Sequence, residues 1–183
     1  MARVLVPLAQ GCEELEAVTV IDLLRRAGIN VVTAGLDHRP VSASRGTVLV
    51  PDTTLDEALK QDYDMVVLPG GQPGTDHLDN DERIHTLLKK MARNKKFTAA
   101  ICAAPKVLAR AGILAGKRAT GFPGVLEGMA LSNVTLLQDA VVQDGTVITS
   151  RGPGTAMDFA LTLIENLAGK DVRNNVEAGL QRG

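Results

Sequence analysis

Cys102 is the residue whose type and setting best suit covalent chemistry. It directly follows an apolar run, residues 98–101, and a helix-forming segment begins immediately after it. Its neighbours Ala100, Ala103 and Ala104 are small, as a sharp strand-to-helix turn requires. Such a turn points the sulfur toward a helix N-terminus, whose partial positive charge favours thiolate. The pattern predicts a nucleophile; the alternative is a buried structural cysteine that packs as a small apolar side chain.

Two glycines, Gly70 and Gly71, end another apolar run at residues 65–68. Glycines at this position permit a tight turn whose backbone amides face the cleft. Beside the sulfur, those amides are a candidate oxyanion hole. The alternative is an ordinary glycine turn without a chemical role.

Glu16 is the candidate acid or base. With Glu13 and Glu14 it opens the first helical pattern, where acidic residues complement the helix dipole. Glu16 differs because the helical period places it with Ala17 and Val20, on the side that turns toward the sheet. A partly desolvated carboxylate near a thiolate has a raised pKa, so it can hold or pass a proton.

Three further residues have weaker signals. Arg26 and Arg45 are candidates for a cationic rim around a small anionic or carbonyl substrate, although an arginine of this kind is by itself more often a solvated surface charge. Cys12 follows the first apolar run and is a candidate resolving thiol for Cys102. The 3 histidines are scattered and no Cys-x-x-Cys pair occurs, so we expect no metal and no cofactor.

The elements that must position these residues alternate between strands and helices. Apolar runs predict strands, and apolar residues at a 3.6 period predict helices. The expected strands cover residues 4–6, 30–34, 65–68, 98–101, 118–120, 134–137 and 147–149, with one or two short strands in 41–50. The expected helices cover residues 13–27, 81–93, 103–111, 155–167 and 171–178.

This alternation predicts a doubly wound α/β fold. Continuous apolar strands separated by helices indicate a mostly parallel sheet with helices on both faces. Ligands of such sheets bind beyond the carboxyl ends of the strands, where Cys12, Gly70 and Cys102 fall. The length of 183 residues suits one domain over residues 1–183.

Composition excludes several functional classes. Lys+Arg 20 against Asp+Glu 21 leaves a net charge of −1, without the basic surplus of a nucleic-acid binder. One tyrosine, three phenylalanines and no tryptophan offer no platform for stacking bases. No apolar run is long enough for a membrane span or a secretory signal, so we expect a cytoplasmic protein.

The chain resembles the DJ-1/ThiJ/PfpI superfamily, closest to the branch that holds the parkinsonism-associated deglycase and the bacterial ThiJ-like proteins. The resemblance extends over almost the whole sequence. Each matching segment is weak evidence alone, but their order and spacing are highly specific. The matching segments are residues 11–16, 22–28, 44–46, 67–71, 99–105 and 149–155.

The resemblance implies a flavodoxin-like α/β sandwich and a homodimer. It places Cys102 at the elbow, with Glu16 within hydrogen-bond reach of the sulfur. It also implies that Gly70, Gly71 and Ala103 supply backbone amides near the sulfur.

Other positions of the family pattern concern the pocket rim. Arg26 and Arg45 match positions that accept an anion near the cysteine across the dimer interface. Ala103 stands where the protease-like branches have a histidine, so a cysteine peptidase or PfpI-type amidase is the least favoured function. Phe122 matches the Gly-Phe-Pro form of the bacterial members. It makes the pocket more apolar and leaves Glu16 as the evident acid/base.

The function that the resemblance implies is a cofactor-independent glyoxalase or protein deglycase. Its substrates would be small reactive aldehydes such as methylglyoxal, or glycated protein, attacked by Cys102 with Glu16 as acid/base. The alternative is a redox-sensing oxidative-stress protein or chaperone that acts through oxidation of Cys102. The expected partner beyond substrate is a second copy of the chain, with no nucleic acid and no membrane.

Overall fold

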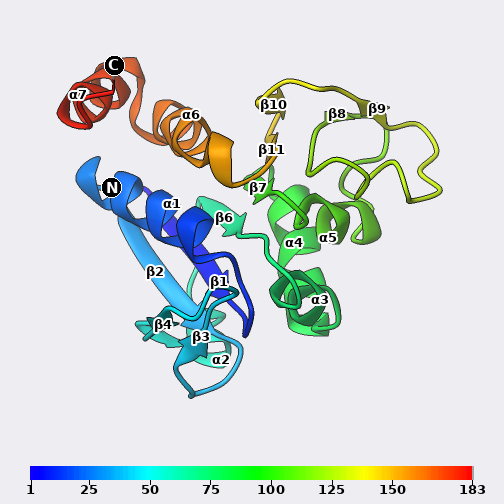
Figure 1. The fold of residues 1–183 in the computed structure, drawn as a ribbon, viewed down its shortest axis with the longest axis horizontal. Helices are drawn as coiled ribbons and strands as arrows, with labels where there is room; N and C mark the ends of the chain where they lie inside the picture. Colours follow the sequence, from blue (N-terminus) through cyan, green and yellow to red (C-terminus); the bar gives the residue numbers. More distant parts are fainter. Residues whose placement is uncertain (183) are drawn as a thin grey trace.

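The computed structural model describes residues 1–182 (Figure 1). The chain contains strands and helices in alternation, as expected from the sequence. In chain order they are β1 (Arg3–Leu8), α1 (Glu14–Arg26), β2 (Asn30–Gly35), β3 (Val41–Ser42), β4 (Val48–Leu49), β5 (Thr53–Thr54), α2 (Leu55–Ala58), β6 (Met65–Leu68), α3 (Gly74–Asp79), α4 (Glu82–Arg93), β7 (Phe97–Ile101), α5 (Pro105–Arg110), β8 (Arg118–Ala119), β9 (Thr135–Leu136), β10 (Val141–Asp144), β11 (Val147–Ser150), α6 (Ala156–Ala168) and α7 (Lys170–Gly179).

A seven-stranded sheet forms the centre, in the order β10-β11-β7-β6-β1-β2-β5. Every pairing in it is parallel except that of β10 with β11. Strand β1 lies between β2 and β6, so the chain winds first in one direction from β1 and then in the other. The predicted doubly wound, mostly parallel α/β fold is therefore confirmed.

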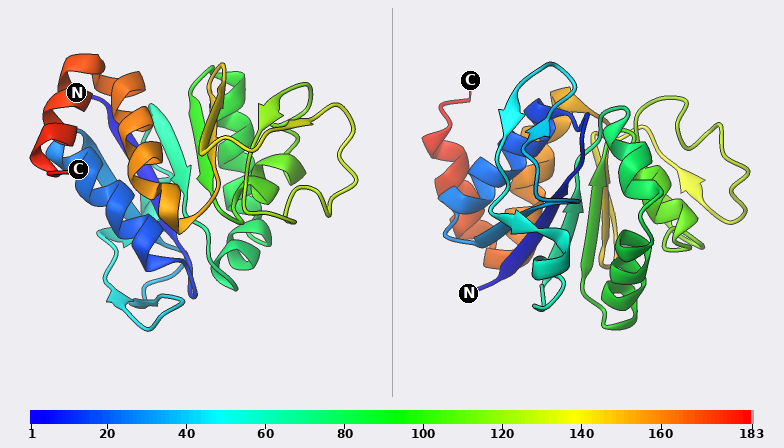
Figure 2. Two further views of the ribbon diagram at one scale, coloured as in Figure 1. Left: turned by 45° about the horizontal axis from the view of Figure 1, so that its top comes forward. Right: turned by 90° about the horizontal axis from the view of Figure 1, so that it is seen from below.

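Helices cover both faces of the sheet (Figure 2). Helices α1, α6 and α7 pack on one face, and α2, α4 and α5 contribute to the core of the other. Successive residues of β1 alternate between the two cores, with Val4 and Val6 in one and Leu5 in the other. Because both sides are buried, the central strands appear in the sequence as continuous apolar runs.

Some elements were not predicted. Strand β10 has the sequence VVQD, which is only partly buried, so it lacks the continuous apolar run of a central strand. Helices α2 and α3 have 4 and 6 residues, too short for a helical period to be recognised. The expected strands in residues 41–50 exist, but β3 and β4 form a separate antiparallel hairpin outside the main sheet.

The fold brings three loops to one edge of the sheet. They follow β1, β6 and β7 at the carboxyl ends of these adjacent parallel strands. The strand order reverses beside β1, which is where doubly wound proteins bind ligands. No helix within residues 1–182 combines the length and apolarity needed to cross a bilayer.

Candidate active site

Cys102 forms the sharp elbow that the sequence predicted. Its φ is 63°, in the left-handed region that residues with a side chain rarely adopt. Its backbone N–H donates to the Ser150 carbonyl oxygen at 3.0 Å, and its own carbonyl oxygen accepts the Phe122 N–H at 2.8 Å. Ala104 N–H donates to Ile101 at 3.0 Å and closes the turn. These contacts hold the strained residue in place and leave the cysteine only partly buried.

Gly70 lies directly against this elbow. A Cβ atom at Gly70 would lie 2.6 Å from Cys102 Cβ, 2.8 Å from Glu16 Oε2 and 2.9 Å from the Ile101 carbonyl oxygen. Real Cβ atoms do not approach this closely, so the position requires glycine. The absence of a side chain at Gly70 is what lets Glu16 and Cys102 come together.

Glu16 is buried on the inner face of α1, as its helical position predicted. Its relative exposure is 0%, and its Oε2 accepts the Gly70 N–H at 2.8 Å. Its Oε1 has no partner of full hydrogen-bond geometry within residues 1–182. One carboxyl oxygen is therefore anchored, while the other has unused hydrogen-bonding capacity.

The environment of Glu16 favours its neutral form. Burial raises the pKa of the carboxyl from an ordinary value of 4.5 to about 7. The Gly70 amide and the Cys102 thiol act in the opposite direction, while the charge of Glu13 adds to the increase. A carboxyl with a pKa near neutrality can both accept and release a proton under physiological conditions.

The pKa of Cys102 does not follow the sequence-based expectation. Burial, the charge of ionised Glu16 and a hydrogen bond to that carboxylate together raise the pKa of the thiol to about 12. The amides of Gly71 and Ala103 oppose this rise without overcoming it. The prediction that Cys102 is a thiolate at rest is therefore wrong for the state in which Glu16 is ionised. The expected stabilisation of the thiolate by a helix dipole is also small, because α5 begins only at Pro105 and has 6 residues.

The two side chains must nevertheless be treated as one titrating pair. Two of the three causes that raise the thiol pKa depend on the negative charge of Glu16. They disappear when Glu16 takes up a proton, and the neutral carboxyl then becomes a hydrogen-bond donor to sulfur. The geometry therefore links a thiolate at Cys102 to a protonated Glu16.

The backbone donors near the sulfur are only partly those expected. Gly71 and Ala103 act on the sulfur through their N–H groups. The expectation that Gly70 also serves as an oxyanion donor is wrong, because its N–H is already donated to Glu16. Gly71 has a φ of 89°, and a Cβ there would lie 2.4 Å from the backbone nitrogen of Glu13. This close approach fixes the position of the remaining glycine amide.

Cys12 lies after β1, at the same sheet edge, but in a closed environment. Its relative exposure is 1%, and its backbone packs against Gly71 and Gly74. Burial, with the charge of Glu14 as the next cause, raises the pKa of its thiol to about 12. A role as resolving thiol therefore requires the surrounding loop to open.

The structure separates the two candidate rim arginines. Arg26 ends α1 and pairs with Asp22 at 2.7 Å, roughly 15 Å along the helix from Glu16. Arg45 is closer to the start of α1, since its backbone N–H donates to Glu14 Oε1 at 3.0 Å. Within one chain Arg26 is thus not part of the Cys102 site. Its expected place across a dimer interface stays a prediction.

Phe122 lies next to the elbow. Its N–H is bound to Cys102, its ring approaches Gly152, and it has a relative exposure of 47%. The ring therefore presents an apolar surface near the cysteine, consistent with the more apolar pocket expected from the sequence.

Two ion pairs that we did not predict connect the helices behind the site. Asp76 of α3 pairs with Lys106 of α5, and Asp79 pairs with Arg110 of the same two helices. Helix α3 follows the Gly70–Gly71 turn and α5 follows Cys102, so these pairs couple the two loops of the site. The sequence contained a signal for these pairs. Asp76 and Asp79 are three residues apart, and Lys106 and Arg110 are four apart, which places each pair of charges on one face of its helix.

The chain is similar to known proteins along most of its length. The model of the DJ-1/PfpI family matches residues 2–166. The Parkinson disease protein 7 homolog of Danio rerio is 45% identical over 181 residues, covering 97% of this chain and 96% of that protein. The glutathione-independent glyoxalase DJR-1.2 of Caenorhabditis elegans is 37% identical over 175 residues, covering 96% of this chain and 92% of that protein.

Solved structures show the same fold. The crystal structure of Drosophila melanogaster DJ-1beta matches with a TM-score of 0.95 and 42% identity, covering 100% of this chain and 98% of that one. Some relatives are longer. The chain spans 39% of the Arabidopsis thaliana protein DJ-1 homolog B and 45% of homolog A.

Proposed function

The chain belongs to the DJ-1/PfpI family, and from that premise we propose that it is a cofactor-independent glyoxalase that converts methylglyoxal-type aldehydes to hydroxy acids. The observation that carries the proposal is the buried Glu16 carboxyl, with a pKa of about 7, beside the strained, partly exposed Cys102. The glyoxalase name of the Caenorhabditis elegans relative supports the same reaction class. Both the nucleophile and the reaction are part of the proposal.

The first step is activation of the sulfur. Ionised Glu16 takes the proton of the Cys102 thiol, which produces a thiolate and a neutral carboxyl at the same time. The thiolate attacks the aldehyde carbon to form a hemithioacetal. The N–H groups of Gly71 and Ala103, which already act on the sulfur, are available to donate to the developing oxyanion.

Glu16 then moves a proton between two carbons of the adduct. It first gives the proton taken from the thiol to the hemithioacetal oxyanion, which makes Glu16 a carboxylate again. The carboxylate then removes the hydrogen from the carbon bonded to sulfur and returns it to the neighbouring carbonyl carbon. The hydroxyl proton moves from the oxygen of the first carbon to the oxygen of the second, which leaves a thioester of the hydroxy acid. Water cleaves the thioester, releases lactate from methylglyoxal and restores the thiol. A pKa of about 7 suits a group that must be base and acid in one cycle.

The test is lactate formation from methylglyoxal by the purified chain, without glutathione or metal. We expect turnover in the wild-type protein and none above buffer in Cys102→Ser, because serine is a far weaker nucleophile at this pH. Lactate formation that is absent from the wild type, or equal in the two proteins, would remove the proposal.

The same attack on early adducts of methylglyoxal with protein side chains would be deglycation. Cys102 is partly exposed and Phe122 has a relative exposure of 47%, which leaves room for a protein-bound adduct to approach. Release of lactate from a freshly glycated peptide, faster than that expected from its free methylglyoxal, distinguishes this substrate from the free aldehyde.

A second function, redox sensing at Cys102, is favoured by its contrast in exposure with Cys12. An oxidant reaches the partly exposed sulfur more readily than one with 1% relative exposure. The free Oε1 of Glu16, when protonated, can donate a hydrogen bond to a sulfinate. Mass spectrometry after mild peroxide treatment should find two added oxygens on Cys102, fewer in Glu16→Gln. Equal oxidation of Cys12 would contradict this role.

We also propose that the chain forms a homodimer. Leu15 and Val18 on α1, and Val48 and Val50 at the β3–β4 hairpin, are apolar yet 45–79% exposed. A second copy that covers these residues would remove apolar surface from water. Sedimentation should give a mass twice the 19.3 kDa of the chain, whereas a monomeric mass would exclude the dimer.

A further inference from the structure

A cavity of about 410 Å³ opens at the carboxyl ends of β1 and β2. Its apolar lining residues are Leu8, Ala9, Leu36 and Val41. Neither Cys102 nor Glu16 lines it. It therefore lies apart from the site described above, although it shares the sheet edge where this fold binds ligands.

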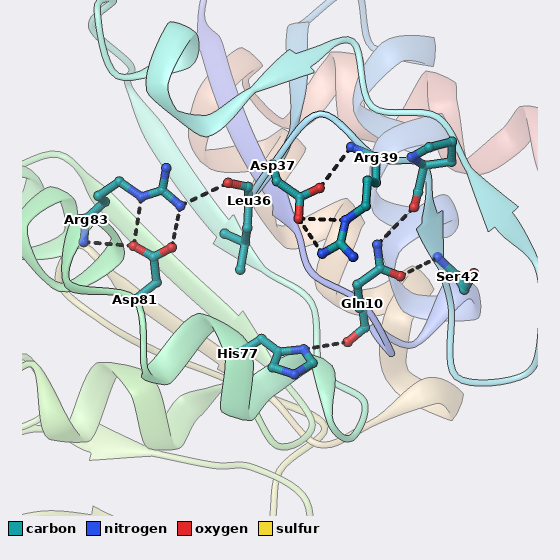
Figure 3. Close-up of polar contacts among 9 residues, drawn as sticks. Gln10, Leu36, Asp37, Arg39, Ser42, His77, Asp81 and Arg83 are labelled. Carbon is teal, nitrogen blue, oxygen red and sulfur yellow. Dashed lines mark hydrogen bonds and ion pairs between the residues drawn. The ribbon is translucent and has the colours of Figure 1, made fainter.

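Side chains hold the walls of this cavity in fixed relation (Figure 3). The Gln10 amide donates to the Pro40 carbonyl oxygen at 2.9 Å, and its Oε1 accepts the Ser42 N–H at 2.9 Å. On the other wall, the Arg83 guanidinium donates to the Leu36 carbonyl oxygen at 3.0 Å. These bonds connect the loops after β1 and β2 with α4, so the cavity is already formed without a ligand.

His77 adds a polar group with a defined orientation. Its Nδ1 lies 2.9 Å from the Gln10 carbonyl oxygen, which can only accept a hydrogen bond. Nδ1 therefore carries the hydrogen, and in the neutral ring Nε2 is left as an acceptor. Figure 3 shows the ring lying across from the Asp37–Arg39 pair.

The charges around the cavity do not balance. Asp37 pairs with Arg39 at 2.6 Å, and Asp81 pairs with Arg83 at 2.6 Å. Glu82, which also lines the cavity, has no ion-pair partner within residues 1–182. The cavity lining thus holds one carboxylate without a cationic partner, Glu82, and the exposed His77 ring, next to the apolar residues.

We propose that this cavity is a second small-molecule site, which binds a monocationic amine with a short apolar body. The ammonium group balances Glu82 and donates to His77 Nε2, while the apolar body covers Leu8 and Val41. A carboxylate ligand would face Glu82 with the same charge, and a neutral ligand would leave Glu82 unbalanced.

The experiment titrates the full chain with n-hexylammonium, n-hexanol and n-hexanoate, followed by amide chemical shifts. These probes share one alkyl chain and differ in charge. We expect hexylammonium to shift the amides of Gln10, Leu36 and residues 77–82. It should bind about fivefold more tightly than hexanol, the upper range for an exposed ion pair, with hexanoate weakest.

Glu82→Gln should reduce the hexylammonium affinity about fivefold, to that of hexanol. The matched control is Glu165→Gln, an exposed glutamate on α6 across the sheet, which should leave it unchanged. Equal affinity for the three probes, shifts confined to other residues, or full binding by Glu82→Gln would each overturn the proposal. The Cys102→Ser chain should bind equally, so the result is independent of the glyoxalase assay.

Discussion

Cys12 and Cys102 each follow a central strand at the same sheet edge, and burial is the largest cause raising both thiol pKa values to about 12. Their backbones differ. At Cys102 the cysteine itself adopts a φ of 63°, whereas beside Cys12 it is Gly11 that adopts a φ of 82°. In the Cys102 loop the strained residue is the cysteine, and its conformation directs the sulfur outward. In the Cys12 loop the positive φ belongs to a glycine and only turns the chain.

Their acidic neighbours differ as well. Glu16 is buried beside Cys102 and has an unoccupied oxygen. Glu14, the main charge acting on Cys12, accepts hydrogen bonds from Ser44, Arg45 and the Thr47 amide. These bonds outweigh desolvation and hold the pKa of Glu14 at about 2. A cysteine at a sheet edge is therefore not sufficient for chemistry; it also needs access and an acid free to exchange a proton.

The largest expected effect contrasts the two acids. Glu16→Gln should lower the rate of lactate formation about a thousandfold, because general acid–base catalysis contributes about 10²–10⁴-fold. Glu14→Gln should change this rate by no more than about threefold, because the Glu14 carboxylate is held by hydrogen bonds within its own loop. The measurement is kcat on methylglyoxal for both purified variants. Comparable losses would mean that the two acids are not functionally distinct.

The next effect concerns stability. Because burial raises the pKa of Glu16 from 4.5 to about 7, the folded state binds the proton more tightly than the unfolded chain. Wild-type stability therefore falls as pH rises through this range, by about 3 kcal/mol from this group. Glu16→Gln lacks this loss. The free energy of unfolding of Glu16→Gln minus that of the wild type, measured in urea, should therefore increase between pH 4 and pH 8. An unchanged difference would refute the raised pKa.

The smallest expected effect compares the two sulfurs directly. In single-cysteine chains made with Cys12→Ser or Cys102→Ser, iodoacetamide should modify Cys102 about thirtyfold faster than Cys12. The latter requires local opening, on the order of 2 kcal/mol. The Cys102 rate should also show a step near pH 7 that Glu16→Gln removes, because the pair titrates as a unit. Equal modification rates would contradict the inferred difference in accessibility between Cys102 and Cys12.

Sequence reasoning predicted the features that depend on local pattern. The small residues around Cys102 indicated the elbow, and the helical period placed Glu16 inward; both placements are observed. It failed where a property depends on which groups meet in space. The Gly70 amide is occupied by a residue 54 positions away, and the thiol pKa depends on that same carboxylate.

The cavity at the carboxyl ends of β1 and β2 illustrates the same limit of sequence reasoning. Gln10 and His77 looked unremarkable in the sequence, and their contact joins residues 67 positions apart. Short elements were missed for a different reason: α3 begins at a glycine and lacks a side-chain cap, so it carries no start signal. Only the parallel register of β1, β2 and β6 brings these segments together.

The hydrogen bond from Gly70 to Glu16, across 54 residues, has a consequence for how the chain folds during synthesis. Strand β1 emerges from the ribosome early but lacks one of its two sheet neighbours until β6 has been translated. Until then no Gly70 N–H is present to replace the water that hydrates the Glu16 carboxyl. Burying this carboxyl would cost free energy, so we expect α1 to stay detached from the nascent sheet. The Glu16 carboxyl therefore becomes enclosed only after β6 and Gly70 have been translated, which is still before Cys102 is added to the chain.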